Sequence, residues 1–111
     1  MYRFIWKIKL HKPEEEQAFI DHWKTGCKIL QEYPGALGTH IHRVRSESGS
    51  LFAVAEWESQ EARDATQVDA EKNESERARR WNQLPKNESF GDGIAFFGEE
   101  IDVILPSNGT T

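Results

Sequence analysis

The sequence predicts an α+β fold built around one antiparallel sheet, and three features of the chain lead to this prediction. Residues 2–10 alternate apolar and polar side chains with the period of two that is typical of a strand. Residues 19–30 repeat apolar side chains at the spacing of one face of a helix. Two more strand-like stretches, residues 36–45 and 51–58, are separated by a short polar turn, so they are expected to pair as a hairpin.

The first strand and the first helix have clear boundaries. The apolar face of the strand carries Tyr2, Phe4, Trp6, Ile8 and Leu10. Pro13, followed by three glutamates, marks the start of the helix, because proline has a preset φ and acidic side chains suit the positive end of the helix dipole. The helix must end near Tyr33, since Pro34-Gly35 cannot continue it. Cys27 lies on the apolar stripe of this helix and is interpreted as a core residue.

The second half of the chain continues with a helix and a last strand. Ser59 is a candidate N-cap, and Asn73 is a candidate cap for a second helical segment, so a break is expected near 72–74. After a loop at 87–93, the last strand is expected over 94–105, with a bulge at Gly98. The order β-α-β-β-α-β predicts the ferredoxin-like arrangement, a four-stranded antiparallel sheet with its helices on one face. Residues 1–105 are expected to form this single domain and residues 106–111 a disordered tail.

Charge and cysteine content narrow the classes of partner. The net charge of −5 over 111 residues disfavours nucleic acid, because phosphate binding needs clustered lysine and arginine. The single cysteine allows no disulfide within the chain and no zinc site made of thiolates. The N-terminal apolar run is too short and too charged for a signal peptide or a membrane span. We therefore expect a cytoplasmic protein with no nucleic-acid or membrane partner.

The predicted strands are apolar on both faces, although helices are expected to cover only one of them. Phe52 and Val54 oppose the apolar residues of the other face of their strand, and Ile94 and Phe96 do the same in the last strand. A monomer would leave a large apolar patch in water, and such a patch marks an interface or a ligand groove. We therefore expect a homodimer in which two sheets pack face to face.

His40 and His42 stand two residues apart, so a strand points both imidazoles to one face. If the hairpin turns about residue 48, His40 lies across from Glu56 and His42 lies across from Val54. Three interpretations stay open: an iron or zinc site, a His–Glu pair that orients a general base, or polar residues of a wall or an interface. We take His40, His42 and Glu56 as the candidate catalytic residues and expect no metal.

The chain resembles the antibiotic biosynthesis monooxygenase family in three places. These are Lys12-Pro13 before the acidic helix start, Pro34-Gly35 before the second strand, and the run Glu56-Trp57-Glu58-Ser59 at the end of the third strand. The resemblance covers residues 2–68, and beyond them only the order of helix and strand agrees. It implies a dimeric α+β barrel with an apolar cavity between the helices and the sheet of each subunit.

Members of this family include oxygenases that convert phenols, hydroquinones or anthrones to quinones without metal or flavin, and others that bind and degrade haem. The haem-degrading branch has an asparagine in its first strand, a tryptophan in its second helix and a histidine later in that helix. Here residues 2–10 contain no asparagine, the tryptophan position falls near Thr66, and residues 59–84 contain no histidine. Haem degradation is therefore disfavoured.

The resemblance thus implies a cofactor-independent monooxygenase that acts on a small aromatic or quinol-like compound. The candidates for binding its ring are the aromatic residues Trp57, Trp6, Trp23 and Phe52. A base must generate the electron-rich phenolate that reacts with O₂, and histidine suits this role near neutral pH. Two alternatives stay open: a non-catalytic dimeric barrel that binds a small ligand, and an isomerase or lyase on the same fold.

Overall fold

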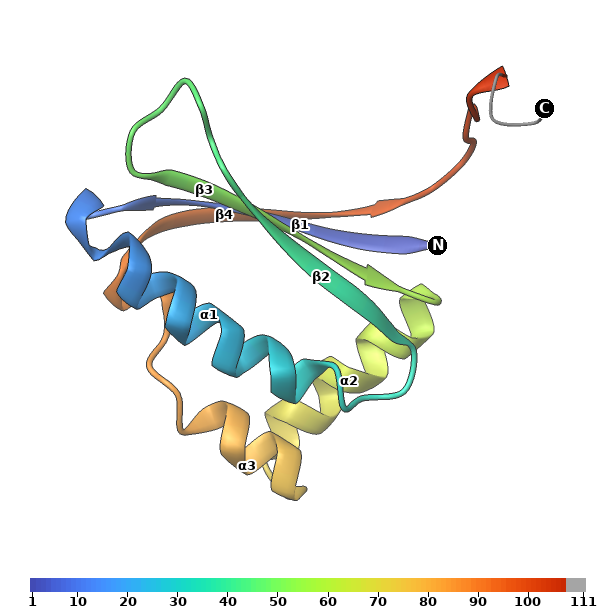
Figure 1. Cartoon of the computed structure of the whole chain (residues 1–111). Helices are drawn as coiled ribbons and strands as arrows, with labels where there is room; N and C mark the ends of the chain where they lie inside the picture. The colour runs from blue at the N-terminus through green and yellow to red at the C-terminus, as the bar shows by residue number, and fades with distance from the viewer. Residues whose placement is uncertain (108–111) are drawn as a thin grey trace.

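In a computed structural model, which describes residues 1–107, one antiparallel sheet carries the helices on a single face (Figure 1). The strands are β1 (Tyr2–Leu10), β2 (Ala36–Arg43), β3 (Ser50–Trp57) and β4 (Gly91–Glu99). The helices are α1 (Glu16–Leu30), α2 (Gln60–Lys72) and α3 (Glu76–Asn82), with short 3-10 turns at Pro13–Glu15 and Asn87–Ser89. The strand order β2-β3-β1-β4 confirms the predicted ferredoxin-like fold. Within residues 1–107, no helix is long and apolar enough to span a membrane.

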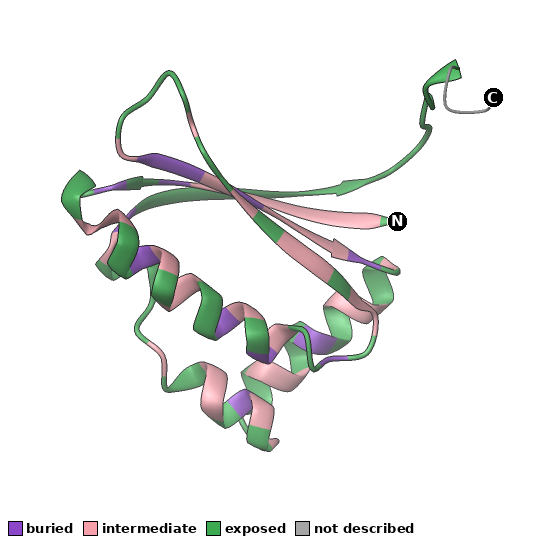
Figure 2. Cartoon of the chain, viewed as in Figure 1, coloured by how far each residue is buried: buried purple, intermediate pink, exposed green. Residues whose placement is uncertain are grey.

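The core lies between the sheet and α1. Ile8, Leu10, Phe19 and Leu51 form a buried cluster, against which Trp6, Trp23, Ile41 and Phe90 pack. The buried residues gather where α1 faces the sheet, whereas β4 is exposed along nearly its whole length (Figure 2). The apolar face predicted for residues 2–10 is therefore the face that the helices cover.

The helical layer breaks where the sequence predicts, although a different residue caps its second segment. Asn73 ends α2 in the left-handed conformation, with φ of 54°, and does not cap the following helix. Ser75 is the true N-cap, since its hydroxyl accepts a hydrogen bond from the Ala78 N–H at 3.0 Å. The Asp69 carboxylate ties this corner together by accepting hydrogen bonds from the Ser75 and Tyr33 hydroxyls, both at 2.6 Å.

The last strand lies earlier in the chain than predicted, over Gly91–Glu99 in place of 94–105, and the bulge predicted at Gly98 is absent. Gly91 belongs to the strand because its backbone passes close to β1: a Cβ there would stand 2.2 Å from the Lys9 carbonyl oxygen. The strand ends at Glu99 because its partner runs out, Glu99 being paired with Tyr2 at the start of β1. The segment after it is extended and exposed up to residue 107. The prediction of a disordered tail at 106–111 falls mostly on residues 108–111, which lie outside the described residues.

The β2–β3 hairpin has a different register from the predicted one. His40 pairs with Val54 and His42 pairs with Phe52, so the expected pairing of His40 with Glu56 is wrong. The turn is centred one residue earlier than expected, which moves every pair by two positions. A shift of two residues keeps each side chain on its predicted face, so His40, His42 and Glu56 still share one face.

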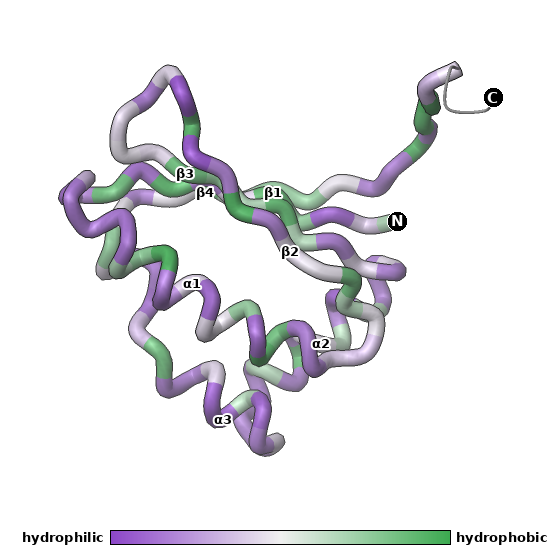
Figure 3. The backbone as a smooth tube through the Cα atoms, viewed as in Figure 1, coloured by the Kyte–Doolittle hydropathy of each residue, from purple (hydrophilic) through white to green (hydrophobic). Residues whose placement is uncertain are grey.

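That shared face is the outer face of the sheet, which no helix within residues 1–107 covers (Figures 1 and 3). Its apolar residues are Ile5, Phe52, Val54, Ile94 and Phe96, as the strand pairing shows. Ile94 and Phe96 remain 67% and 53% exposed, so the patch predicted for this face is present in the single chain.

Candidate functional site

An apolar cavity of about 220 Å³ lies between the sheet and the helices. We call it the inner cavity. Its walls come from β1, β2, β3, α1, α2 and α3, and they include Phe4, Trp6, Trp23, Leu30, Trp57 and Trp81. The volume is below the range of about 300–1,000 Å³ that is usual for drug-sized ligands, so the cavity suits a compound of the size of a small aromatic.

Three of the four predicted ring-binding residues line this cavity. Trp6 reaches it from β1, Trp23 from α1 and Trp57 from the end of β3. Trp57 is 2% exposed, and its indole Nε1–H has no hydrogen-bond acceptor among residues 1–107. Phe52 lies elsewhere: it is on the outer face, where its ring stacks on His42 with the centroids 4.5 Å apart.

Arg63 is the one charged side chain that the described residues bring to the wall of the inner cavity. It comes from α2, and its guanidinium carbon stands 5.4 Å from the ring centroid of Phe4 and 5.3 Å from that of Phe97. Its Nη1 donates a hydrogen bond to Gln67 Oε1 at 3.1 Å. Burial lowers the pKa of Arg63, because desolvation disfavours the charged form.

Cys27 also lines the inner cavity, on the side of α1. Burial raises the pKa of its thiol to about 11, which a hydrogen bond with Thr39 partly opposes. The thiol is therefore protonated at neutral pH and does not act as a nucleophile there. This agrees with its interpretation as a core residue.

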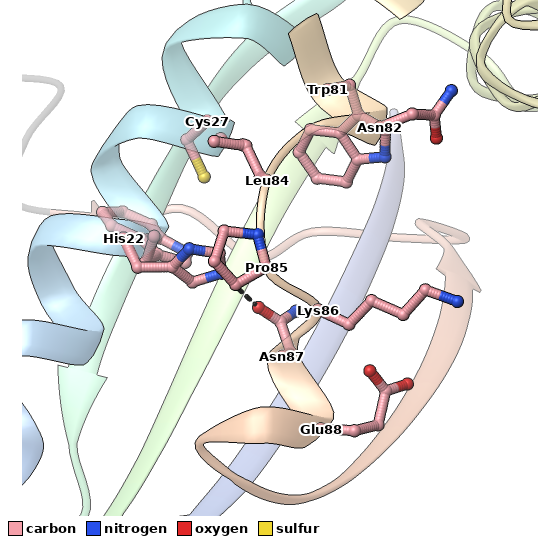
Figure 4. Close-up of a pocket in the computed structure, with 11 residues that line it drawn as sticks. His22, Cys27, Trp81, Asn82, Leu84, Pro85, Lys86, Asn87 and Glu88 are labelled. Atoms are coloured by element: carbon pink, nitrogen blue, oxygen red, sulfur yellow. Dashed lines mark hydrogen bonds between the residues drawn. The ribbon is translucent and has the colours of Figure 1, made fainter. Parts of the chain in front are cut away.

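A second cavity, of about 370 Å³, adjoins the first between α1 and the segment that follows α3 (Figure 4). It shares Trp23, Cys27, Trp81 and Asn87 with the inner cavity. Its wall also holds His22, whose Nε2 is 3.1 Å from Asn87 Oδ1, and whose ring stacks on Phe90. His22 is half-buried, at the edge of the cavities.

The predicted catalytic residues lie on the far side of the sheet from the inner cavity. His40 Nε2 is 3.7 Å from Glu56 Oε1, so the structure brings this pair together. Glu56 also accepts a hydrogen bond from Arg3 Nη2 at 3.2 Å, and Arg3 in turn pairs with Glu100 at 2.9 Å. Among the described residues, no three histidine, cysteine or acidic side chains form a group that could hold a metal. His40, His42 and Glu56 therefore lie on the outer face and do not line the inner cavity.

Sequence reasoning missed Arg63, Trp81 and Asn87 as lining residues of the inner cavity. Arg63 lies on a weakly amphipathic helix with many charged residues, where an arginine is usually solvated. Trp81 and Asn87 lie beyond the part of the chain that resembles the family. One signal was available, since an arginine that directly follows the apolar Ala62 on α2 lies next to the buried stripe of that helix.

Comparisons with known proteins agree with this fold. The crystal structure of a mutant of SnoaB, a cofactor-independent oxygenase from Streptomyces nogalater, matches with a TM-score of 0.71 and 14% identity, over 95% of this chain and 97% of that one. A structure described as an antibiotic biosynthesis monooxygenase matches with a TM-score of 0.64 and 16% identity, over 92% and 100%. A protein from Pseudomonas aeruginosa matches with a TM-score of 0.63 and 16% identity, over 91% and 94%.

Identities this low show the fold alone, and the family has to come from the sequence itself. No curated protein sequence matches the chain. The sequence model of the family described as antibiotic biosynthesis monooxygenase matches residues 1–70, which span β1 to most of α2 and include Trp6, Trp23, Trp57 and Arg63. The chain therefore belongs to the antibiotic biosynthesis monooxygenase family.

Proposed function

We propose that the chain is a cofactor-independent monooxygenase that oxidises a small aromatic or quinol-like compound in the inner cavity. The observation that carries the proposal is the cavity itself, a partly open apolar space walled by tryptophans in a member of this family. The described activity of SnoaB, a cofactor-independent oxygenase on the same fold, supports the choice of reaction. Because fold alone does not fix chemistry, the proposal depends on a direct assay.

The proposed reaction balances without a cofactor. The ring carbon opposite a phenolic oxygen, which is a CH in the phenol and a CH₂ in its keto tautomer such as an anthrone, becomes C=O. One atom of O₂ enters that carbonyl, and the other leaves as water with the two hydrogens. The substrate supplies all the electrons, so the protein has only to bind the ring, favour its anion and keep water out. Trp6, Trp23 and Trp57 line the inner cavity, and in this proposal they bind the ring.

We propose His40 or His42, oriented by Glu56, as the base only for the alternative in which the compound is bound at the outer face and not in the inner cavity. These residues lie across the sheet from the inner cavity, so a substrate inside that cavity is out of their reach. They act as the base only on a compound that is bound at the outer face. The assignment therefore makes a sharp prediction: if either histidine is the base, its alanine variant loses activity, whereas full activity of both variants removes the assignment.

The first experiment is oxygen uptake by metal-stripped protein against hydroquinones, catechols and anthrones. Uptake above the spontaneous rate, lost on heating the protein, is the expected result. Trp57→Phe and Trp23→Phe should raise KM, while Val68→Ala, an exposed position on α2, serves as the control. No uptake, together with saturable quenching of tryptophan fluorescence, would instead support a non-catalytic binding protein. Conversion of a compound in the absence of O₂ would support an isomerase or lyase.

We also propose that two copies associate through the outer face. The exposed apolar residues of this face, together with Ile101, Ile104 and Leu105 in the extension after β4, make a surface that a second copy would cover. Sedimentation equilibrium should give twice the chain mass at micromolar concentration. Phe96→Glu should give the chain mass, and Val68→Glu, which places the same charge at an exposed apolar position on α2, should not.

A further inference from the structure

We infer that the inner cavity selects an aromatic ligand that carries an anionic oxygen, a carboxylate or a phenolate, and that Arg63 and Trp57 bind this oxygen. The inference rests on the proposed function only in taking this cavity as the place where the substrate binds. It adds a chemical class of ligand and a specificity-determining residue, Arg63, outside the residues that the sequence pointed to.

The first observation is an arginine in an apolar wall without a carboxylate partner. Arg3, Arg43 and Arg80 each pair with a glutamate, whereas none of the ion pairs within residues 1–107 includes Arg63. Its contacts are the faces of two phenylalanine rings and one amide oxygen, and the neighbouring Asp64 acts on its charge without forming an ion pair. A guanidinium has five N–H donors, so most of those of Arg63 remain available to a ligand. A partly buried cation of this kind favours an anion beside it.

The second observation is independent of the first. Trp57 is 2% exposed, lines the same cavity, and has an indole N–H without an acceptor among the described residues. Buried donors nearly always find a partner, and Trp57, which borders the inner cavity, is an exception. We take its N–H as the second donor to the ligand. Trp57 ends β3 and Arg63 lies in the first turns of α2, so one short segment supplies both donors.

The remaining wall sets the rest of the specificity. Within residues 1–107, no aspartate or glutamate lines the inner cavity, so nothing described there repels an anion, although the chain as a whole carries a charge of −5. The other lining groups are mostly apolar, among them Trp6, Trp23 and Ala53. The site therefore combines an aromatic body with one charged donor, and this arrangement distinguishes an anionic aromatic from its neutral isostere.

The test compares two ligands of equal shape, 2-naphthoate and 2-naphthamide, by calorimetry at pH 7.5 under anaerobic conditions. The wild-type protein should bind the naphthoate at least about tenfold more tightly, which is the effect of one charge-assisted hydrogen bond. Arg63→Gln should remove this preference, and Arg63→Lys should keep part of it. Trp57→Phe should weaken binding of the naphthoate more than that of the amide. Arg79→Gln, which removes the same charge from an exposed position on α3, should change neither affinity.

Equal affinity for the two ligands in the wild type, an unchanged preference in Arg63→Gln, or no binding of either compound would overturn the inference. Circular dichroism of each variant separates loss of the site from loss of the fold, and the charge-retaining Arg63→Lys offers a second check. Because no turnover is measured, the two proposals fail separately. Naphthoate preference without oxygen uptake would overturn the oxygenase alone, and oxygen uptake without the preference would overturn the anion site alone.

Discussion

The two faces of the sheet use the same strands for different kinds of surface. On β3, Leu51, Ala53 and Trp57 are buried under the helices, while Phe52, Val54 and Glu56 alternate with them on the outer face. The covered face holds a cavity to which residues 1–107 bring one cation and no acid. The outer face holds an ion network of Arg3, Glu56 and His40 beside half-exposed apolar residues. Because side chains alternate along a strand, the residues that line the cavity lie on one face and the two histidines lie on the other.

The largest expected difference between the faces is in stability, measured at matched isoleucines. Ile8 on β1 is 0% exposed within the core, and Ile8→Ala should lower the free energy of unfolding by about 2–5 kcal/mol. Ile94 on the outer face is 67% exposed in the single chain, and Ile94→Ala should change the free energy of unfolding by no more than about 0.5 kcal/mol at dilutions that favour the monomer. Urea unfolding measures both.

Protein concentration turns this pair into a test of what covers the outer face. If a second copy covers Ile94, the effect of Ile94→Ala should grow as the concentration rises, because association stabilises the folded state by mass action. The effect of Ile8→Ala should stay large at every concentration. Equal losses for the two variants at high dilution would contradict the division into a covered and an open face.

The second prediction compares the stability of alanine variants at two glycines, one in α1 and one in β4. A Cβ on Gly26 of α1 would stand 2.9 Å from Trp81 Cζ3, whereas a Cβ on Gly98 of β4 would have nothing within 4 Å among the described residues. Gly26→Ala gains about 1 kcal/mol of helix propensity but should cost about 1–3 kcal/mol of overpacking, so a net loss of up to about 2 kcal/mol is expected. Gly98→Ala should be close to neutral.

Tryptophan emission checks the cause of that loss. Gly26→Ala should shift the emission, because Trp81 must move away from α1, and Gly98→Ala should leave it unchanged. A stabilised Gly26→Ala with unaltered emission would mean that Trp81 does not press against α1 in solution, and the shared wall of the two cavities would then be looser than described.

Most of the fold could be predicted from the sequence because its signals are local. The period of two in residues 2–10, Pro13 before the acidic turn and Ser59 before α2 each depend on neighbours in the chain, and each is confirmed. The errors in the bounds of the last strand concern features that depend on a strand distant in the sequence. Gly91 enters β4 because the Lys9 carbonyl lies beside it, and β4 ends at the pair of Glu99 with Tyr2, where β1 begins.

The site was harder to predict, because a pattern of faces does not say which face becomes enclosed. The sequence placed His40, His42 and Glu56 on one face correctly, and only the packing of the helices shows that this face is not the one with the cavity. Arg63 gave little signal, since its burial depends on Phe4 and Phe97, which lie far from it in the sequence. Trp57 could be predicted because it ends the third strand, where the mouth of the cavity is expected.

The third prediction concerns the groups that contact one carboxylate on the outer face of the sheet and one on the helical side. Glu56 on the outer face contacts a charged arginine, but Asp69 on the helical side is held by two neutral hydroxyls, Ser75 and Tyr33. These hydrogen bonds lower the pKa of Asp69, the one from Ser75 most. A lowered pKa adds stability that is fully present above the ordinary aspartate pKa of about 3.9 and is lost as pH falls through the pKa of the folded state.

Asp69→Asn should therefore be less stable than the wild type at neutral pH, and the difference should shrink as the pH drops below about 3.9. Urea unfolding between pH 7 and pH 3 gives the two curves. Asp64→Asn removes the same charge from an exposed position on the same helix and serves as the control for the loss of a surface charge. A constant gap between Asp69→Asn and the wild type at all pH values would show that the hydroxyls contribute packing and not charge stabilisation.

The smallest effect is a rate, and it tests whether the covered face excludes water. The pKa of Cys27 is raised to about 11 by burial, so alkylation by iodoacetamide should accelerate up to about pH 11, whereas an exposed thiol would level off above its ordinary pKa of about 8.5. Cys27→Ser should take up no label, since Cys27 is the single cysteine, and circular dichroism should show the fold intact at each pH. Levelling near pH 8.5 would mean that water reaches the thiol, and with it the wall that Cys27 shares between the two cavities. The covered face would then not exclude water. A hydrated cavity would screen Arg63 and weaken any preference for an anionic ligand.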